Sequence, residues 1–520
     1  MKKVSAEWDL EESKDLTTWY TDQYYKQLDI EEGGGTLQQR HNEILLHTLS
    51  LWNDFHFLCP LIRDFNLTAL ENVDNETLEL LLPQLLSAAK NTRDLELTRL
   101  LIDRVQNVRT GCIKLFWLLV VEVEREAGNH LRDPLNYEGH DYFFARTVQL
   151  FRRKLCKVNL CMEQTLVKQG NLVEKLVEIS CTIRQSRKSI SGKKKLITDI
   201  ITESKDLLLF DPISLPIKGD VQTIGIVPEQ CSVFQSQLNP LLLSFLTKSG
   251  GIIKCLFKSG DDLRQDSFML QILKTACCIL EHNGISAKDI VLYEVVSTGL
   301  VHGFVEFVPS ECLDNLFQDP KGLGKILRNE DGSLDETKMS RFIDSTAHYT
   351  VITYLMCIGD RHLDNILITP EGKLFHIDYG FIGREPKPFA PAVKLCPEMI
   401  DIMGGKFSGY YASFMRRCLT TFLVLRKNSH ILLDMFELMI DAGIPDINVT
   451  TLGKIKNRFA LDMSDEDAVN LLTTRIEKGF ENVLPKMMDN FHHTWKVVQS
   501  GAGSSAPKDD DQLDDWCYLE

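Results

Sequence analysis

The sequence predicts an α+β fold in which an all-α segment precedes a β-rich lobe and a second, mainly helical lobe. Three observations lead to this prediction. From about residue 40 to residue 205 the apolar residues recur at helical spacing. From residue 211 the chain changes to short β-branched and aromatic runs separated by turn residues. After Pro309 the helical spacing returns and continues to about residue 498, interrupted by one hairpin.

These changes divide the 520 residues into five expected parts. Three of the parts are expected to fold, which agrees with the two to four domains that the length suggests. They are a flexible N-terminal segment (1–35), a helical accessory domain (36–205), an N-lobe (211–308), a C-lobe (309–499) and a disordered acidic tail (500–520).

The composition is that of an ordinary globular protein, with 44% hydrophobic and 25% charged residues. A net charge of -15 argues against nucleic-acid binding. The 14 cysteines lack zinc-ligand spacing and indicate reduced thiols. The N-terminus has no secretory signal, and the most apolar run, LFWLLVVEV at 115–123, is too short to span a bilayer. We therefore expect a cytoplasmic protein whose membrane contact is peripheral.

The all-α segment reads as a solenoid-like array of helix pairs. Leu97, Leu101 and Val105 recur at i, i+4 and i+8, and breaks are expected near Gly128, Pro134 and Gly170. The basic stretch RQSRKSISGKKKLITDI (184–200) predicts an exposed loop, which serves either as solvated surface or as a contact for anionic lipid or a partner. In the β-rich lobe one helix, DDLRQDSFMLQILKTACCILEHN, interrupts the strands.

The stretch GDRHLDNILITPEGKLFHIDYGF (359–381) carries the chemistry. Two apolar runs separated by a Pro/Gly turn predict a β-hairpin, which brings Asn365 and Asp378 side by side at its open end. Amide and carboxylate oxygens there suit Mg²⁺ or Mn²⁺ bound to nucleotide phosphates. Asp360 and His362 project toward the same point. The alternative is that these are ordinary turn and hairpin-end residues.

Phosphoryl transfer also needs a cation against the nucleotide phosphates. Lys258 ends an apolar strand, and Asp266 follows after a short turn at the start of a helix, in GIIKCLFKSGDDLRQD. A lysine at a strand end is usually just exposed, but the DDLRQD run makes this one a candidate phosphate ligand.

Together GDDLRQD, GDRHLDN and HIDYG resemble the phosphatidylinositol 3- and 4-kinase superfamily, whose catalytic loop is D-R-H-x-x-N. GREPKPFAPAVKLCPEMIDIMGG and FALDMSDEDAVNLL resemble the class III phosphatidylinositol 3-kinases of vacuolar sorting and autophagy. The resemblance covers roughly residues 75–495. It implies a two-lobed kinase-like catalytic domain that uses ATP to phosphorylate the inositol 3-hydroxyl of phosphatidylinositol.

The resemblance also implies roles for individual residues. Within the loop Asp360, Arg361 and His362, His362 would accept the proton from the hydroxyl and Asp360 would orient it; neutral imidazole suits a general base. Asn365 and Asp378 would hold the metal ions. The nucleotide would be bound by Lys258, Asp266, Ser236, the hinge residues Glu306, Phe307 and Val308, and the wall residues Tyr293, Leu256, Leu367 and Ile377. Ordinary core packing is the alternative for the last four.

The activation loop offers only Arg384, Lys387 and Lys394 to a headgroup, which favours unphosphorylated phosphatidylinositol. The helix expected at 484–499 resembles a membrane-contacting terminal helix, with packing on the catalytic loop as the alternative. Peripheral binding to endosomal, vacuolar or autophagic membranes follows from the resemblance. The acidic residues of the tail would be repelled by an anionic membrane, so removing it should raise activity there.

The chain also departs from the family pattern. Tyr379 stands where phenylalanine is usual, so its hydroxyl needs a partner. The activation loop is one residue short, Gln235 replaces a common basic residue, and we expect no C2 sandwich. A pseudokinase-type regulatory subunit and an autophagy scaffold are therefore candidate partners only through the kinase lobes. A phosphatidylinositol 4-kinase, a related protein kinase and a catalytically dead scaffold are the alternative functions.

Overall fold

The computed structural model describes residues 67, 70–127, 143–359, 361–383 and 392–481. Several predictions fall outside these described residues: the segment 1–35, the breaks near Gly128 and Pro134, Asp360, Arg384, Lys387, the helix 484–499 and the tail 500–520.

Helices alone build the first part of the described chain, as the spacing of apolar residues predicts. Two of them begin at a capping aspartate: Asp74 Oδ1 accepts a hydrogen bond from the Thr77 N–H (2.8 Å), and Asp94 Oδ1 accepts one from the Glu96 N–H (2.8 Å). The helices are α4 (Asn75–Thr92), α5 (Leu95–Val105), α6 (Arg109–Ala127), α7 (Phe143–Val158), α8 (Leu160–Gln185), α9 (Ile190–Glu203) and α10 (Lys205–Leu208). The stripe Leu97, Leu101 and Val105 is buried in α5.

Two local predictions in this part are wrong. Gly170 does not break a helix but lies inside α8, where buried neighbours such as Leu166 and Val173 hold the helix against the roughly 1 kcal/mol that glycine costs. The basic stretch 184–200 is mostly helical rather than a loop, because Ser189 caps α9 by accepting a hydrogen bond from the Gly192 N–H (3.3 Å). Most of its cationic side chains are nevertheless exposed.

The β-rich lobe is an antiparallel sheet with strand order β1-β2-β4-β5-β7-β6, and β3 pairs with β4. Helix α11 (Arg264–His282) packs on β6. The strands are β1 (Ile213–Leu215), β2 (Lys218–Ile226), β3 (Ser232–Val233), β4 (Leu241–Thr247), β5 (Ile252–Ser259), β6 (Val295–Gly299) and β7 (His302–Glu306), with the short helix η2 (Pro228–Gln230) before β3.

The second lobe is mainly helical and contains a three-stranded sheet of order β10-β9-β8. The sequence predicted its hairpin but not β8, which has only two residues. The elements are β8 (Glu311–Cys312), α12 (Leu313–Gln318), α13 (Gly324–Leu327), α14 (Glu336–Leu355), η3 (Leu363–Asn365), β9 (Ile366–Ile368), β10 (Leu374–His376), α15 (Pro397–Ile402), α16 (Gly409–Lys427), α17 (Ser429–Glu437), η4 (Ile440–Ala442), α18 (Val449–Phe459) and α19 (Asp465–Glu481).

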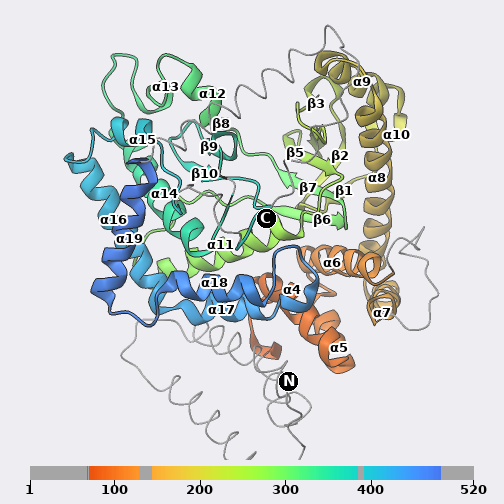
Figure 1. Ribbon diagram of the computed structural model, residues 1–520. Helices are drawn as coiled ribbons and strands as arrows, with labels where there is room; N and C mark the ends of the chain where they lie inside the picture. The colour runs from red at the N-terminus through yellow and green to blue at the C-terminus, as the bar shows by residue number, and fades with distance from the viewer. Residues whose placement is uncertain (1–66, 68–69, 128–142, 360, 384–391, 482–520) are drawn as a thin grey trace, which may run out of the picture.

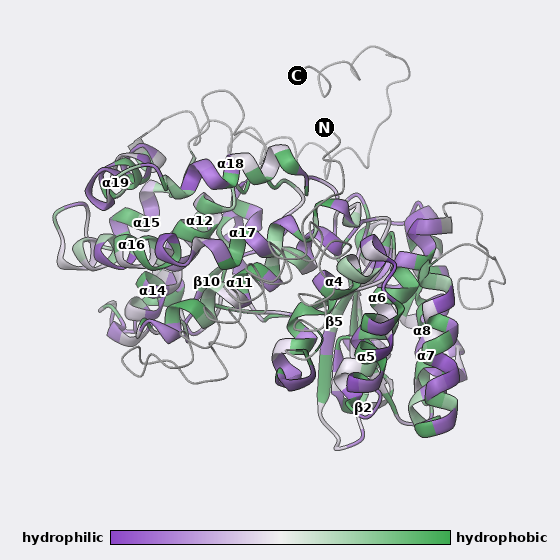
Figure 2. Ribbon diagram, turned by 90° about the horizontal axis from the view of Figure 1, so that it is seen from below, coloured by the Kyte–Doolittle hydropathy of each residue, from purple (hydrophilic) through white to green (hydrophobic). Residues whose placement is uncertain are grey.

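Helix α11 lies at the centre of the molecule, between the N-lobe sheet and the C-lobe helices α16 and α17, which it contacts (Figure 1). Helices α6, α7 and α8 lie beside the sheet, away from α14, α16 and α19. Many helices are green on one side and purple on the other (Figure 2), as expected where one face of each helix is buried. The predicted α+β class, with a two-lobed kinase-like unit after a helical part, is confirmed. Within the described residues, every helix is too short or too polar to cross a membrane.

Candidate active site

The predicted hairpin is confirmed and sets the geometry of the site. Strands β9 and β10 pair antiparallel, with Leu367 opposite Phe375. Gly372, at a φ of +86°, makes the tight turn, and its N–H donates to the Thr369 carbonyl (2.9 Å). At the open end the Ile377 N–H donates to the Asn365 carbonyl (3.0 Å). Asn365 therefore lies directly beside the residue that precedes Asp378.

Asp378 is held in an uncommon conformation. Its φ is +60°, in the left-handed region that residues other than glycine rarely adopt. Its side chain is exposed, and its Oδ1 accepts a hydrogen bond from the Gly380 N–H (3.3 Å). Asn365, by contrast, is 6% exposed. The two predicted metal ligands are thus one buried amide and one open carboxylate.

Lys258, at the end of β5, belongs to a cluster of opposite charges. Its Nζ lies 3.4 Å from Asp261 Oδ2, and it interacts electrostatically with Asp266 and Asp378. Burial works to lower the pKa of Lys258, but the three carboxylates outweigh burial and raise it. The ammonium therefore stays charged at neutral pH, as a phosphate ligand must.

Asp266 lies in the first turn of α11 and is 8% exposed. Burial raises its pKa to about 6; the charge of Asp378 adds to the rise, and Lys258 and the Tyr379 N–H oppose it. Asp266 Oδ1 accepts that N–H at 2.6 Å. The start of α11 is thereby joined to the backbone next to Asp378.

Arg361 joins the catalytic loop to the same place. Its Nε donates to the Gly359 carbonyl (3.0 Å), its Nη1 to the Ile377 carbonyl (2.8 Å) and its Nη2 to the Asp378 carbonyl. Its guanidinium also lies over the Tyr379 ring, 5.6 Å from the centroid. The structure thus shows Arg361 as a clamp on the backbone of the Asp378 segment.

His362 directly precedes η3 and is partly buried. Its carbonyl accepts the Asn365 N–H at 3.0 Å, and its Nδ1 lies 3.9 Å from Asp364 Oδ2. The turn therefore places His362 in the loop that ends on Asn365. Its role as a base, like every assigned role, stays a prediction.

The Tyr379 hydroxyl, which the family pattern lacks, has the hydrogen-bond partner that it needs. The side chain is fully buried, and its Oη donates to the His376 carbonyl at 2.9 Å. Tyr293 Oη donates to the same carbonyl from 3.5 Å. The Tyr293 ring meets the Phe375 ring edge-on, with centroids 6.0 Å apart, so Tyr293 lies in the core behind the hairpin.

The other predicted wall residues, Leu256, Leu367 and Ile377, are partly exposed, as the walls of an open site would be. Leu256 pairs with Val305 across β5 and β7, while Leu367 and Ile377 belong to the hairpin segment. One of the three comes from the N-lobe and two from the C-lobe, so both lobes contribute to the predicted walls.

The hinge is largely occupied by internal hydrogen bonds. The Glu306 N–H donates to the Glu294 carbonyl (2.9 Å), and the Phe307 N–H donates to the Lys254 carbonyl (3.3 Å). Glu306 Oε1 also pairs with Lys218 Nζ at 2.7 Å. Among the described residues the Val308 N–H has no such partner, which makes it the candidate donor to an adenine ring.

Ser236 is exposed in the turn between β3 and β4. The Asn239 N–H donates to its carbonyl (3.2 Å), and Asn239 Nδ2 donates to it as well. Lys193, from α9, in turn donates to Asn239 Oδ1. The turn that carries Ser236 is therefore held from the helical part of the chain, a contact that sequence reasoning missed.

Two further residues were missed although the DDLRQD run contains both. Asp261 is the nearest anion to Lys258, and Gln265 Nε2 donates to the Tyr379 carbonyl at 2.7 Å. Of the predicted headgroup cations, only Lys394 lies in the described part of the chain, where it is partly exposed.

Comparisons with known proteins give the family. Residues 252–449 match the family described as phosphatidylinositol 3- and 4-kinase. Over 85% of its length the chain is 35% identical to phosphatidylinositol 3-kinase pik3 of Schizosaccharomyces pombe, of which it covers 57%. It is 33% identical to phosphatidylinositol 3-kinase VPS34 of Arabidopsis thaliana, with 83% of this chain and 54% of that protein aligned. The VPS34 protein of Saccharomyces cerevisiae is 35% identical over 62% of this chain and 38% of its own.

The chain thus spans little more than half the length of the first two of these relatives. The match includes β5, α11 and the hairpin, which carry the charge cluster and the two predicted metal ligands. Residues 252–449 thus form a domain of the phosphatidylinositol 3- and 4-kinase family, and over most of its length the chain is similar to phosphatidylinositol 3-kinases.

Proposed function

We propose that the protein transfers the γ-phosphoryl group of ATP to the inositol 3-hydroxyl of phosphatidylinositol. The observation that carries this proposal is the meeting of Lys258, Asp266 and Asp378, which come from β5, α11 and the hairpin. A retained cation beside an exposed carboxylate is what phosphoryl transfer needs for holding phosphates and neutralising charge. The names of the relatives supply the substrate class.

Nucleotide binding is assigned to both lobes. Lys258 would hold the phosphates, and the Val308 N–H would bind the adenine edge. Leu256, Leu367 and Ile377 would cover the base, with Tyr293 behind them, and Ser236 would close over the phosphates. Partial exposure of the three aliphatic side chains supports this assignment.

The residues at the hairpin fit a hard divalent cation. Asn365 and Asp378 supply one amide and one carboxylate oxygen, the ligand types that Mg²⁺ and Mn²⁺ accept alongside phosphate oxygens. When bound, the cation would neutralise charge on the nucleotide phosphates. Arg361 fixes the backbone on which Asp378 stands, so it would keep that carboxylate aimed at the site.

For the hydroxyl we assign His362 as the proton acceptor and Asp360 as the group that orients it. Neutral imidazole is suited to take a proton near pH 7. Because His362 lies in the loop that ends on Asn365, its ring would act close to the metal-bound phosphate.

Arg384, Lys387 and Lys394 would receive the lipid headgroup, and three cations suit phosphatidylinositol better than its bisphosphate. We propose cytoplasmic residence with peripheral attachment to endosomal, vacuolar or autophagic membranes through the activation loop and residues 484–499. Regulatory partners of pseudokinase and scaffold type would bind the kinase lobes. We also propose residues 36–205 as the accessory domain and 211–308 and 309–499 as the two lobes.

The test is transfer of radiolabel from ATP to vesicles containing phosphatidylinositol, its 4-phosphate or its 4,5-bisphosphate. We expect label on phosphatidylinositol, at the 3-position, that is lost in His362→Ala. The control is His430→Ala, an exposed histidine of α17. Label at the 4-position would establish a 4-kinase instead. Bound ATP without labelled lipid would support a scaffold.

A further inference from the structure

A cavity lies outside the kinase centre, between the helical part of the chain and the N-lobe. Its volume is about 360 Å³, within the range of small-molecule sites. Helices α4, α6 and α11, the start of β2 and residues 292–297 line it. Lys258, Asn365 and Asp378 are not among the lining residues, although Tyr293 is.

The apolar part of the cavity is fixed by contacts behind its walls. Trp117 Nε1 donates to Gln169 Oε1 at 2.9 Å, which sets the plane of the indole. The Phe268 ring packs edge-on against Phe436, with centroids 5.1 Å apart. Pro83, from inside α4, also lines the cavity. The contacts of Trp117 and Phe268 thus hold two walls of the cavity from behind.

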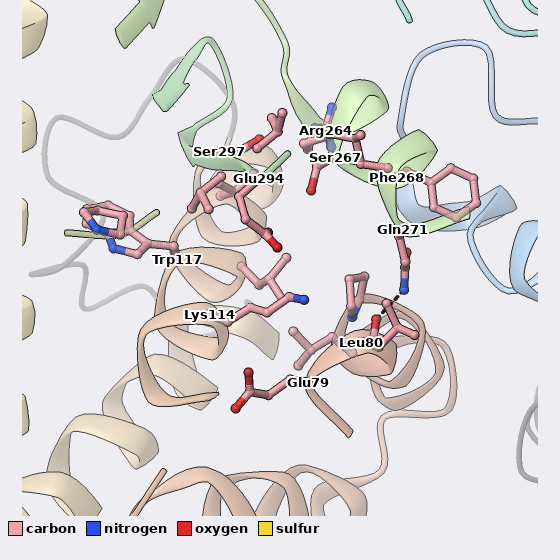
Figure 3. A pocket seen from close by; sticks show the side chains of 18 of the residues that line it. Glu79, Leu80, Lys114, Trp117, Arg264, Ser267, Phe268, Gln271, Glu294 and Ser297 are labelled. Carbon is pink, nitrogen blue, oxygen red and sulfur yellow. Dashed lines mark hydrogen bonds between the residues drawn. The ribbon is translucent and has the colours of Figure 1, made fainter. Parts of the chain in front are cut away.

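Two opposite charges point into this space from different walls. Figure 3 shows the Lys114 ammonium, from α6, and the Glu294 carboxylate, from the residues before β6, directed into the cavity. Burial lowers the pKa of Lys114, with Glu294 and Glu79 opposing this effect. Among the described residues, neither the Lys114 nor the Glu294 side chain forms a hydrogen bond or an ion pair.

Ser297 adds a third polar group at the rim. Its Oγ is buried and has no hydrogen-bond partner in the described part of the chain. Buried polar atoms are normally paired, so the unpaired Ser297 Oγ indicates a place for a ligand atom, and the partly exposed Lys114 and exposed Glu294 offer a cation and an anion to the same ligand.

We propose that this cavity binds a compact, mainly apolar molecule whose polar end carries both an acceptor for Lys114 and an N–H donor for Glu294, such as an aromatic carboxamide or lactam. A carboxylate would satisfy Lys114 but meet the Glu294 charge, and an amine would satisfy Glu294 but meet the Lys114 charge. A neutral amide-type group satisfies both.

Such a ligand would also act on α11. Gln271 of this helix lines the cavity, and it exchanges hydrogen bonds with Gln84 of α4 (Nε2 to Oε1, 2.6 and 3.0 Å) while donating to the Leu80 carbonyl. The same helix carries Asp266 toward the kinase centre. Occupancy of the cavity would therefore stiffen the contact between α4 and α11 behind Asp266. The effect of this stiffening on the kinase centre rests on the proposed function, whereas binding to the cavity does not.

The test uses three probes with one apolar body: biphenyl-4-carboxamide, biphenyl-4-carboxylate and biphenyl-4-methylamine. Affinities for the whole chain are measured by calorimetry and by saturation-transfer NMR. We expect the carboxamide to bind about tenfold more tightly than the other two, the effect of one additional hydrogen bond to a charged group. A saturating nonhydrolysable ATP analogue should not displace it.

Substitutions of the lining residues test whether the probe binds in this cavity. Lys114→Met and Glu294→Met should each weaken the carboxamide about tenfold, whereas Lys427→Met, an exposed lysine of α16, should not. If Lys114→Met fails to fold, Glu294→Met, at an exposed position, still decides the matter. Equal affinity for the three probes, displacement by the nucleotide analogue, unchanged affinity in the methionine variants or absence of binding would each overturn the proposal.

Discussion

Replacing Asp266 by asparagine is expected to stabilise the fold at neutral pH while impairing nucleotide use. The exchange removes one buried negative charge but keeps Oδ1, which accepts the Tyr379 N–H at 2.6 Å. The side chain is 8% exposed, so its charge is poorly solvated. Lys258 keeps Asp261 and Asp378 as electrostatic partners in the variant.

The magnitude follows from the shift in the Asp266 pKa, from 3.8 to about 6 in the folded protein. An acid whose folded pKa is raised contributes stability that is complete below the unfolded pKa and is lost as the pH rises through the folded value. For Asp266 this loss takes place between about pH 4 and pH 6, and a rise of about two pKa units corresponds to ~3 kcal/mol. Asparagine does not titrate, so the variant should not lose this part of the unfolding free energy.

The assay is denaturant unfolding of the nucleotide-free chain, followed by tryptophan fluorescence from about pH 4 to pH 7. Wild type should lose more stability across this range than Asp266→Asn. In Lys258→Met the unfolding free energy should fall over a higher pH range than in wild type, because removing the cation raises the Asp266 pKa further. The reasoning is refuted if Asp266→Asn and wild type lose the same stability over this range.

Three further substitutions test the hairpin and its supports. Arg361→Lys replaces a planar guanidinium that donates to three carbonyls, so turnover in the vesicle assay should fall by about tenfold to a hundredfold. Unchanged turnover would show that these hydrogen bonds are not needed for catalysis. Tyr379→Phe deletes the hydrogen bond to the His376 carbonyl and should cost about 1 kcal/mol in thermal unfolding with activity largely retained, whereas loss of activity would show a chemical role for the hydroxyl. Gly372→Ala should destabilise the fold by about 2 kcal/mol, because its φ is +86° and the new Cβ would lie 2.7 Å from the Lys338 carbonyl; an unchanged melting temperature would contradict the turn geometry.

The hairpin could be predicted because its signal is local. Two apolar runs and one Pro/Gly turn determine the pairing, and the pairing places Asn365 beside the Asp378 segment. Helical spacing likewise identified most helices. The break expected at Gly170 was wrong because glycine acts on local propensity alone, whereas burial of Leu166 and Val173 decides whether α8 continues.

Contacts between distant segments could not be predicted from such patterns. The hydrogen bond between Asp266 and the Tyr379 N–H joins residues 113 positions apart, and Lys193 reaches Asn239 from another part of the fold. The cavity beside α4 likewise forms only when α4 and α6 meet α11. No periodicity in one segment specifies which side chains a remote segment will place against it.

The hydrogen bonds between the side-chain amides of Gln84 and Gln271 limit where the chain can be truncated. The family match begins at residue 252, yet α11 is covered by α4 from far upstream, and the Leu300 N–H donates to Glu124 of α6 at 2.8 Å. A fragment trimmed to the matched residues would expose Gln271 and leave its amide without its described partners. The family match and the folded unit therefore have different boundaries in this protein, and a minimal catalytic fragment should retain the sequence from α4 onward.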